Sequence, residues 1–171
     1  MAAGPVHVAV AGPGDATPEI CTLAREVGRL LAERGAVVVT GGLGGVMAAA
    51  AEGAAAAGGM SIGLLPGTDR ADGNTHSTVL IPTGLGEGRN VLLVRSADGL
   101  VAVGGSWGTL TEIALARRAD VPVVCLEGWS VITPDGAPLP LETAASPTMA
   151  VQRVFELIEG RSAVAPGKMD R

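Results

Sequence analysis

Three short apolar runs in this chain each end in a glycine-rich turn that leads into a stretch with helical spacing. The turns occupy residues 12–14, 41–45 and 104–108. An apolar run of this length is typical of a buried parallel strand, and glycine lets the backbone turn tightly into the next helix. Because the carboxyl ends of parallel strands meet at one edge of a sheet, we expect the three turns to border one crevice.

The rest of the chain keeps the same alternation of strand and helix. Strands are predicted at residues 6–11, 36–40, 61–65, 78–81, 100–103 and 121–126. Helices are predicted at residues 17–34, 46–57, from 89 onward, 110–119 and 148–159, and an irregular segment at residues 129–145. This order predicts an α/β fold, a Rossmann-like, doubly wound and mostly parallel sheet with helices on both faces. We expect a single domain over residues 1–160 and a flexible tail over residues 161–171.

The composition excludes several classes of function. A net charge of −5 argues against a nucleic-acid partner or an anionic membrane surface. Cys21 and Cys125 are isolated thiols, which is typical of a protein in the reducing cytoplasm. Together with His7 and His76 they show no metal-ligand spacing, so we expect no metal and no other cofactor. No signal peptide or membrane-spanning helix is predicted.

The turn at residues 104–108 is the strongest candidate for a ligand site. It joins an apolar run to a helix, and the free backbone N–H groups at a helix N-terminus bind anions. Thr109 is predicted to cap this helix, and Glu112 to lie in its first turn. Phosphate is the anion that we predict.

A dinucleotide site fits the sequence poorly. Gly12 and Gly14 supply two glycines of the fingerprint, but Thr17 stands at the third position. The second predicted strand ends at Thr40 with no acid to hold a ribose hydroxyl, which argues against NAD. A Walker A loop is excluded because the only lysine of the chain is Lys168.

The same turn also fits the serine-hydrolase pattern G-x-S-x-G around Ser106. That pattern lies on a strand-to-helix turn, as the fold of those enzymes requires. Their order of residues, however, needs a histidine after the serine, and both His7 and His76 precede it. We therefore do not expect a serine hydrolase.

Two motifs together resemble the LOG-like family, which is related to the cytokinin-activating phosphoribohydrolases and has historically been labelled as lysine decarboxylases. The family signature pairs Arg-Lys with Pro-Gly-Gly-x-Gly-Thr-x-x-Glu. Arg89-Asn90 and the stretch from Gly104 to Glu112 align with it without a gap. The glycine motif that follows the second strand is similar as well, and the resemblance covers about residues 6–126.

The resemblance implies a nucleoside-monophosphate pocket and a homodimer or larger oligomer. It also implies that Arg89 and Glu112 act on the N-glycosidic bond, with Glu112 stabilising positive charge on the sugar or activating water. The residues predicted to bind the phosphate or nucleotide are Gly12, Gly14, Gly41, Gly42, Gly45, Met47, Asn90, Gly104, Gly105, Ser106, Trp107, Gly108 and Thr109.

The chain departs from the signature at three positions. Asn90 replaces the lysine, Gly104 replaces the proline and Ser106 replaces a glycine. The stretch from Gly84 to Asn90 looks like that of a distinct branch. This branch is similar to molybdenum-cofactor carrier proteins, which bind a phosphorylated pterin without turning it over. Two functions therefore stay open, a nucleoside 5′-monophosphate phosphoribohydrolase and a non-catalytic carrier or sensor of a phosphorylated ligand.

Lysine decarboxylation is rejected, because pyridoxal-phosphate chemistry needs a lysine and Lys168 lies in the predicted tail. We expect the pocket walls to come from the loop at residues 68–77 and from a partner subunit. We further expect Trp107 to flank the ligand or the dimer interface, since the chain has few other aromatic residues.

Overall fold

A computed structural model describes residues 4–164 of the chain. Within these residues it contains seven strands, five α-helices and two short 3-10 helices. The strands are β1 His7–Ala11, β2 Val37–Thr40, β3 Ser61–Leu65, β4 Val79–Pro82, β5 Gly99–Val103, β6 Val123–Leu126 and β7 Glu142–Ala144. The helices are α1 Pro18–Glu33, α2 Val46–Ala56, α3 Arg89–Arg95, α4 Trp107–Arg118 and α5 Pro147–Val164, with η1 Arg70–Asp72 and η2 Gly86–Gly88.

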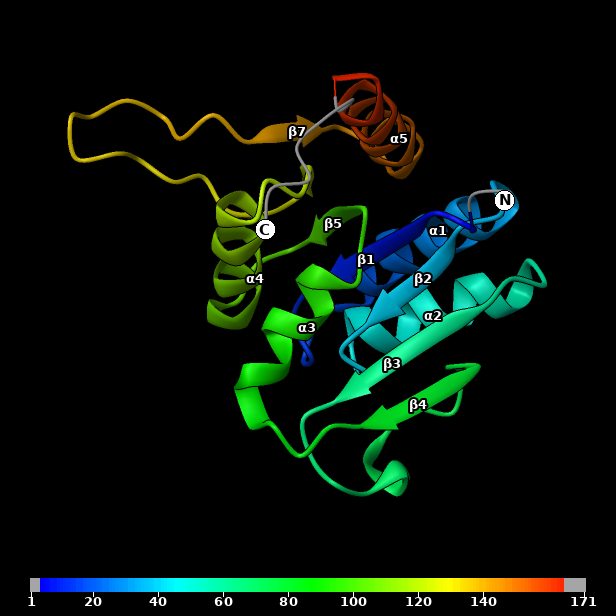
Figure 1. The fold of residues 1–171 in the computed structure, drawn as a ribbon. Coiled ribbons are helices and arrows are strands. Elements are labelled where there is room, and N and C mark those ends of the chain that lie inside the picture. The colour runs from blue at the N-terminus through cyan, green and yellow to red at the C-terminus, as the bar shows by residue number, and fades with distance from the viewer. Residues whose placement is uncertain (1–3, 165–171) are drawn as a thin grey trace, which may run out of the picture.

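The strands form one parallel sheet in the order β4-β3-β2-β1-β5-β6-β7 (Figure 1). Strand β1 lies at its centre, with Val8 paired to Val38 of β2 and Ala9 paired to Leu100 of β5. The chain builds outward from β1 to one edge and then to the other. The predicted Rossmann-like, doubly wound sheet is therefore confirmed, and ligands of such sheets bind where the strand order reverses.

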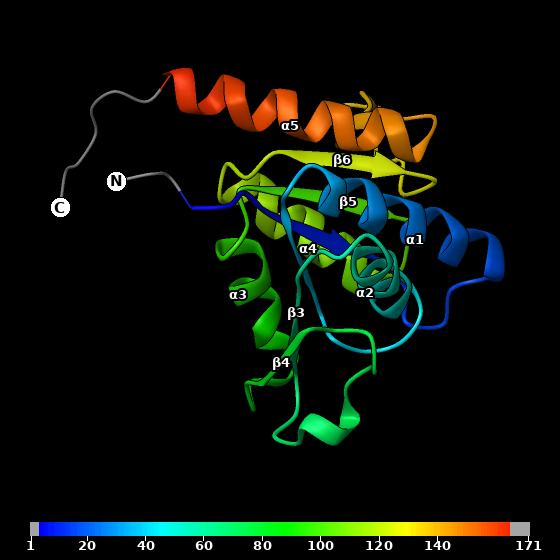
Figure 2. The same cartoon turned by 90° about the vertical axis from the view of Figure 1, so that its right-hand side faces the viewer.

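The two faces of the sheet are covered by different helices (Figure 2). Val8 and Val10 of β1 pack in a core with α1, α2 and α5. Ala9 and Ala11 point the other way and pack in a core with α3 and α4. This alternation follows from the two-residue period of a strand, because every second side chain lies on the same face.

Small residues let α1 and α2 pack almost backbone to backbone. A Cβ on Gly28 would lie 2.0 Å from the carbonyl oxygen of Ala50, and a Cβ on Gly53 would lie 1.9 Å from that of Arg25. Only glycine fits at these two positions. The alanine-rich α2 is consequently held firmly against α1, and its N-terminus is fixed at the carboxyl ends of the strands.

The largest differences from the sequence prediction concern three elements. The segment predicted to be irregular contains β7, which is short and largely exposed at the sheet edge and so carries no apolar run. Helix α4 begins at Trp107 and is capped by Ser106, not by Thr109, so Glu112 is its sixth residue and lies beyond the first turn. Helix α5 continues to Val164, past the predicted start of the tail, and residues 165–171 lie outside the described residues.

Between β6 and β7 the chain extends away from the body of the molecule (Figure 1). Both ends of the described chain lie together at the amino ends of the strands (Figure 2). Residues 4–7 and Ile158 of α5 line one shallow groove there. None of the helices in residues 4–164 is long and apolar enough to cross a membrane.

Candidate functional site

A cavity of about 420 Å³ lies beyond the carboxyl ends of the strands, between the N-terminal ends of α2, α3 and α4. Ten of the residues predicted to form the site line it, namely Gly12, Gly14, Met47, Arg89, Asn90, Ser106, Trp107, Gly108, Thr109 and Glu112. Five further lining residues are Leu43, Pro66, Gly86, Glu87 and Thr111. The structure thus brings parts of all three glycine-rich turns to one cavity.

Five predicted glycines lie behind the cavity wall, namely Gly41, Gly42, Gly45, Gly104 and Gly105. Gly45, at φ +58°, begins α2 in contact with Pro13, where a Cβ would lie 2.3 Å from the carbonyl oxygen. Gly104, at φ +68°, makes the turn between β5 and α4. These positions shape the loops that carry the lining residues.

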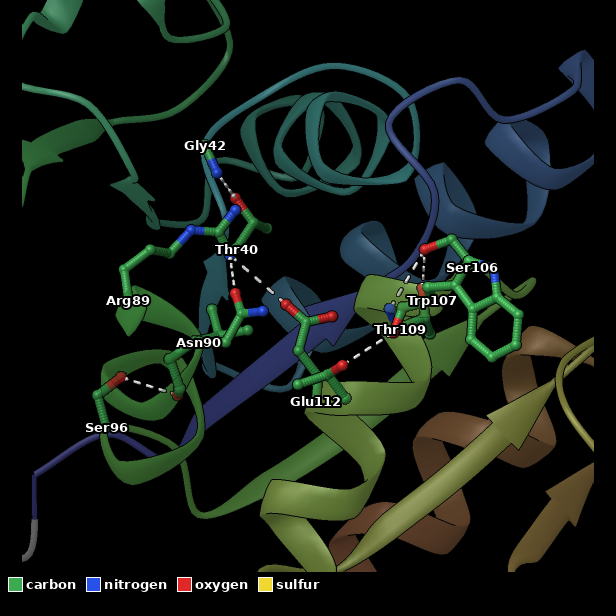
Figure 3. A network of polar contacts seen from close by, with 11 residues as sticks. Thr40, Gly42, Arg89, Asn90, Ser96, Ser106, Trp107, Thr109 and Glu112 are labelled. Atoms are coloured by element: carbon green, nitrogen blue, oxygen red, sulfur yellow. Dashed lines mark hydrogen bonds and ion pairs between the residues drawn. The ribbon is translucent and has the colours of Figure 1, made fainter. Parts of the chain in front are cut away.

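Arg89, the first residue of α3, is buried with 8% of its surface exposed. Its Nη1 donates to Oδ1 of Asn90 at 2.8 Å and to Oε1 of Glu112 at 3.5 Å (Figure 3). Its Nε is fully buried and has no hydrogen-bond partner among the described residues. The guanidinium packs on Gly41, where a Cβ would lie 2.4 Å from Nη2.

Glu112 faces Arg89 from α4 and is 7% exposed (Figure 3). Burial raises the pKa of its carboxyl group to about 7, against the opposing effect of the Arg89 guanidinium. Burial also lowers the pKa of Arg89, although an arginine stays charged at neutral pH. In both residues the cost of burial exceeds the gain from the partner, since only one long contact joins them.

The N-terminus of α4 borders the cavity beside this pair. Ser106 Oγ accepts from the backbone N–H of Thr109 at 3.2 Å and lies 2.9 Å from its Oγ1. The N–H groups of Trp107 and Gly108 have no partner within residues 4–164. Free amides at the positive end of a helix, next to a buried arginine, form a site for an anionic group such as phosphate.

The loop at residues 68–77 does not line the cavity, contrary to the sequence prediction. It supports the wall from behind instead. Asn74 donates from Nδ2 to the carbonyl oxygens of Gly42 and Leu43, at 3.0 and 3.1 Å. The loop therefore fixes the turn after β2, of which Leu43 reaches the cavity.

Trp107 stands at the rim of the cavity with 77% of its surface exposed. Its ring lies 5.4 Å from that of Trp129 and, in Figure 3, beyond Ser106 on the side away from Arg89. Trp129 Nε1 donates to the carbonyl oxygen of Ser106 at 3.0 Å, and its ring lies so close to Gly105 that a Cβ there would be 3.0 Å from Nε1. The two indoles thus buttress the turn before α4.

No histidine of the described chain lines the cavity, so Ser106 lacks the base of a catalytic triad. His7 is the first residue of β1 and so lies at the amino ends of the strands, away from the cavity. Its Nδ1 is 3.2 Å from the carbonyl oxygen of Ser96. Ser106 Oγ is used instead to cap α4. Within residues 4–164 no three His, Cys, Asp or Glu side chains gather as a metal site would require.

Sequence reasoning did not assign Pro66, Gly86 and Glu87 to the site, although all three line the cavity. Pro66 ends β3, and Gly86 and Glu87 form the short helix before α3. A signal was available for these three, because any residue that follows a parallel strand or precedes a site helix reaches the same edge of the sheet.

Comparisons with known proteins agree with this fold. Residues 5–154 match the model of the SLOG cluster4 family. An uncharacterized protein of Archaeoglobus fulgidus is 41% identical over 139 residues, which cover 77% of this chain and 91% of that protein.

Solved structures are similar over nearly the whole chain. The molybdenum cofactor binding protein of Rippkaea orientalis is 33% identical at a TM-score of 0.82, covering 91% of this chain and 98% of its own. The molybdenum cofactor carrier protein of Chlamydomonas reinhardtii is 34% identical at a TM-score of 0.79, covering 91% of this chain and 99% of its own.

Proposed function

The chain belongs to the SLOG cluster4 family, and from this premise we propose that it binds a phosphorylated small molecule of the molybdenum-cofactor type and carries it without turning it over. Two similar solved proteins are named for binding or carrying that cofactor. The phosphorylated pterin is cargo in this proposal, held by the cavity at the carboxyl ends of the strands.

The observation that carries the proposal is the buried guanidinium of Arg89. An arginine has five N–H donors, and here only Nη1 bonds to any described residue. Leaving buried charged donors unpaired costs free energy, so a site of this kind is completed by an anion. The free amides of Trp107 and Gly108 supply further donors to the same anion.

A second function, phosphoribohydrolase activity on nucleoside 5′-monophosphates, is favoured by the pair of Arg89 and Glu112. Hydrolysis breaks the bond between C1′ of the ribose and the base nitrogen, and water adds to C1′ while the base leaves with a proton. A carboxyl group with a pKa of about 7 is suited to move that proton near neutral pH. Arg89 would orient the carboxylate and the sugar phosphate.

One experiment separates the two functions. The purified protein is incubated with AMP, GMP, CMP and UMP, and release of free base is followed with Glu112→Gln as the control. Base release that disappears in the variant would establish the hydrolase. No release, together with a rise in Tm in the presence of a phosphorylated ligand, would support the carrier.

A direct test of the carrier uses molybdenum cofactor released from a molybdenum enzyme under anaerobic conditions. The protein is mixed with the cofactor, separated by gel filtration and assayed for transfer to a cofactor-free molybdenum enzyme. We expect the protein fraction to restore activity and Arg89→Ala to lose this capacity. A wild-type fraction that restores no activity would contradict the carrier function.

We also propose a homodimer or larger oligomer that packs through the flank of α3. Leu85, Val91 and Leu92 are exposed there, at 54%, 46% and 43%. Val91 also borders a groove between α3 and α4 that is lined by Val94 and Leu115. Light scattering on Val91→Asp tests this surface, and an unchanged oligomer would contradict it.

The free thiol of Cys21 supports the proposed cytoplasmic location.

A further inference from the structure

The position of Arg89 in the cavity is set by a neutral acceptor more than by its charged partner. Nη1 lies 2.8 Å from Oδ1 of Asn90 but 3.5 Å from Oε1 of Glu112. Asn90 is itself buried, with 9% of its surface exposed. It follows Arg89 directly in the first turn of α3, so the two side chains share one anchor on the backbone.

A neutral acceptor holds a cation without neutralising it. A carboxylate at the same place would form a close, bidentate ion pair with the guanidinium and occupy the donors that a ligand needs. The guanidinium also packs directly on the backbone of Gly41, in the space that a Cβ at that position would occupy. Asn90 and Gly41 together keep the guanidinium beside Glu112 but not closed upon it.

We propose that Asn90 is a positioning residue, whose amide oxygen holds the guanidinium of Arg89 off Glu112 and so keeps it available to an anionic group of the ligand. This inference deepens the function proposed above and rests on it. Asn90 both contacts Arg89 and lines the cavity. In this inference it determines whether the guanidinium pairs with Glu112 or stays open to an anion.

Binding of the anion is then coupled to a proton. The charged groups that line the cavity are Glu87 of η2, Arg89 of α3 and Glu112 of α4. When a phosphate binds Arg89, the carboxylate of Glu112 takes up a proton from solvent, which removes the repulsion between two anions. Because the pKa of Glu112 is raised to about 7, this uptake costs little at neutral pH.

The first test needs no ligand. Asn90→Leu removes the acceptor with little change in volume, and leaves Glu112 Oε1 as the remaining hydrogen-bond acceptor of Nη1 among the described residues. The guanidinium should close on Glu112 and lower its pKa by about one unit or more. Carbon-13 NMR of labelled glutamate carboxyls measures this pKa, with Glu112→Gln to assign the resonance.

Two further variants keep this test decisive. Asn90→Asp retains an acceptor oxygen for Nη1 and should leave the pKa of Glu112 at or above its wild-type value. Thr22→Val changes a residue of α1 outside the cavity, whose hydroxyl bonds to the carbonyl oxygen of Pro18, and should have no effect. If Asn90→Leu folds and its Glu112 titrates as in the wild type, the positioning role is overturned.

Binding supplies the second readout. Calorimetric titration with AMP and with ribose 5-phosphate at pH 6 and pH 8 should show at least about tenfold weaker binding by Asn90→Leu, because its arginine is engaged internally. Equal affinities of Asn90→Leu and wild type would overturn the inference. Wild-type protein that binds neither probe, while Asn90→Leu shows the pKa change, would refute the phosphoribohydrolase function and leave the positioning role intact.

Discussion

The guanidinium of Arg89 lies directly on Gly41, so that a Cβ at position 41 would come within 2.4 Å of Nη2 and 2.6 Å of Cζ. The glycine that follows β2 therefore leaves the space in which the guanidinium of Arg89 packs, although Arg89 starts α3 nearly fifty residues later in the chain. The glycine motif around Gly41 and the motif that contains Arg89 are thus in direct contact in the structure.

Gly41→Ala should displace Arg89 with little harm to the fold, because the contacted atoms belong to the end of a long side chain. We expect ligand affinity to fall at least about tenfold and the free energy of unfolding to change by less than about 1 kcal/mol. Calorimetry and urea denaturation measure the two effects. Gly88→Ala, whose Cβ would meet only Leu85 at 3.9 Å, is the matched control. A large loss of stability in Gly41→Ala would contradict this account.

Gly12→Ala should give the opposite result. A Cβ on Gly12 would lie 2.4 Å from the carbonyl oxygen of Val103 and 2.6 Å from both γ-carbons of Val46. Backbone and buried valine cannot yield as a flexible side chain does, so we expect a loss of about 3 kcal/mol or more in the free energy of unfolding. Urea denaturation beside Gly41→Ala tests it, and equal stabilities of the two variants would refute the distinction.

Glu112→Gln should change how stability depends on pH. In the unfolded chain a glutamate loses its proton near pH 4.5, whereas in the fold the raised pKa keeps it protonated to about pH 7. The native state binds the extra proton between these values, so wild-type stability falls as pH rises from 4.5 to 7 by up to about 3 kcal/mol. The variant lacks this dependence. Parallel curves of unfolding free energy against pH for the two proteins would show the carboxyl to be unperturbed.

Trp107 should report on ligand binding. The chain has two tryptophans, so Trp129→Phe leaves Trp107 as the only one. Its exposed indole stands at the rim of the cavity, and a ligand that reaches from Arg89 to the N-terminus of α4 will cover part of it. We expect the emission to shift to shorter wavelength on saturation with AMP or another phosphorylated ligand. Emission that stays constant while calorimetry records binding would place the ligand away from this indole.

Much of the fold was predictable because the buried strands are short apolar runs, which is the pattern typical of parallel strands. Residues 61–65 were predicted as a strand with the bounds of β3, and the other buried strands differ by one or two residues at an end. Strand β7 was missed for a physical reason. It is three residues long, polar and paired on one side only, so pairing with β6 defines it and its own sequence does not.

The site was predictable where a motif carries it and not elsewhere. The motifs brought Arg89, Glu112 and the turn before α4 to one cavity, as the structure also places them. They could not show that Asn90 holds the guanidinium, because that contact depends on the side-chain conformations of two neighbouring residues at the start of α3. Nor could they show that Asn74 supports the turn after β2, because that contact joins two separate segments. The sequence prediction placed the N-cap at Thr109, whereas in the structure Ser106 caps α4 and accepts from the backbone N–H of Thr109.

The two ends of the described chain lie at the amino edge of the sheet, and the cavity opens at the carboxyl edge. A probe or linker attached at residue 4 or on the last turns of α5 would therefore sit on the side of the sheet away from the cavity mouth. Tethered at such a position, the protein would keep its cavity facing solvent, so that binding of the proposed phosphorylated ligand could be measured at a surface.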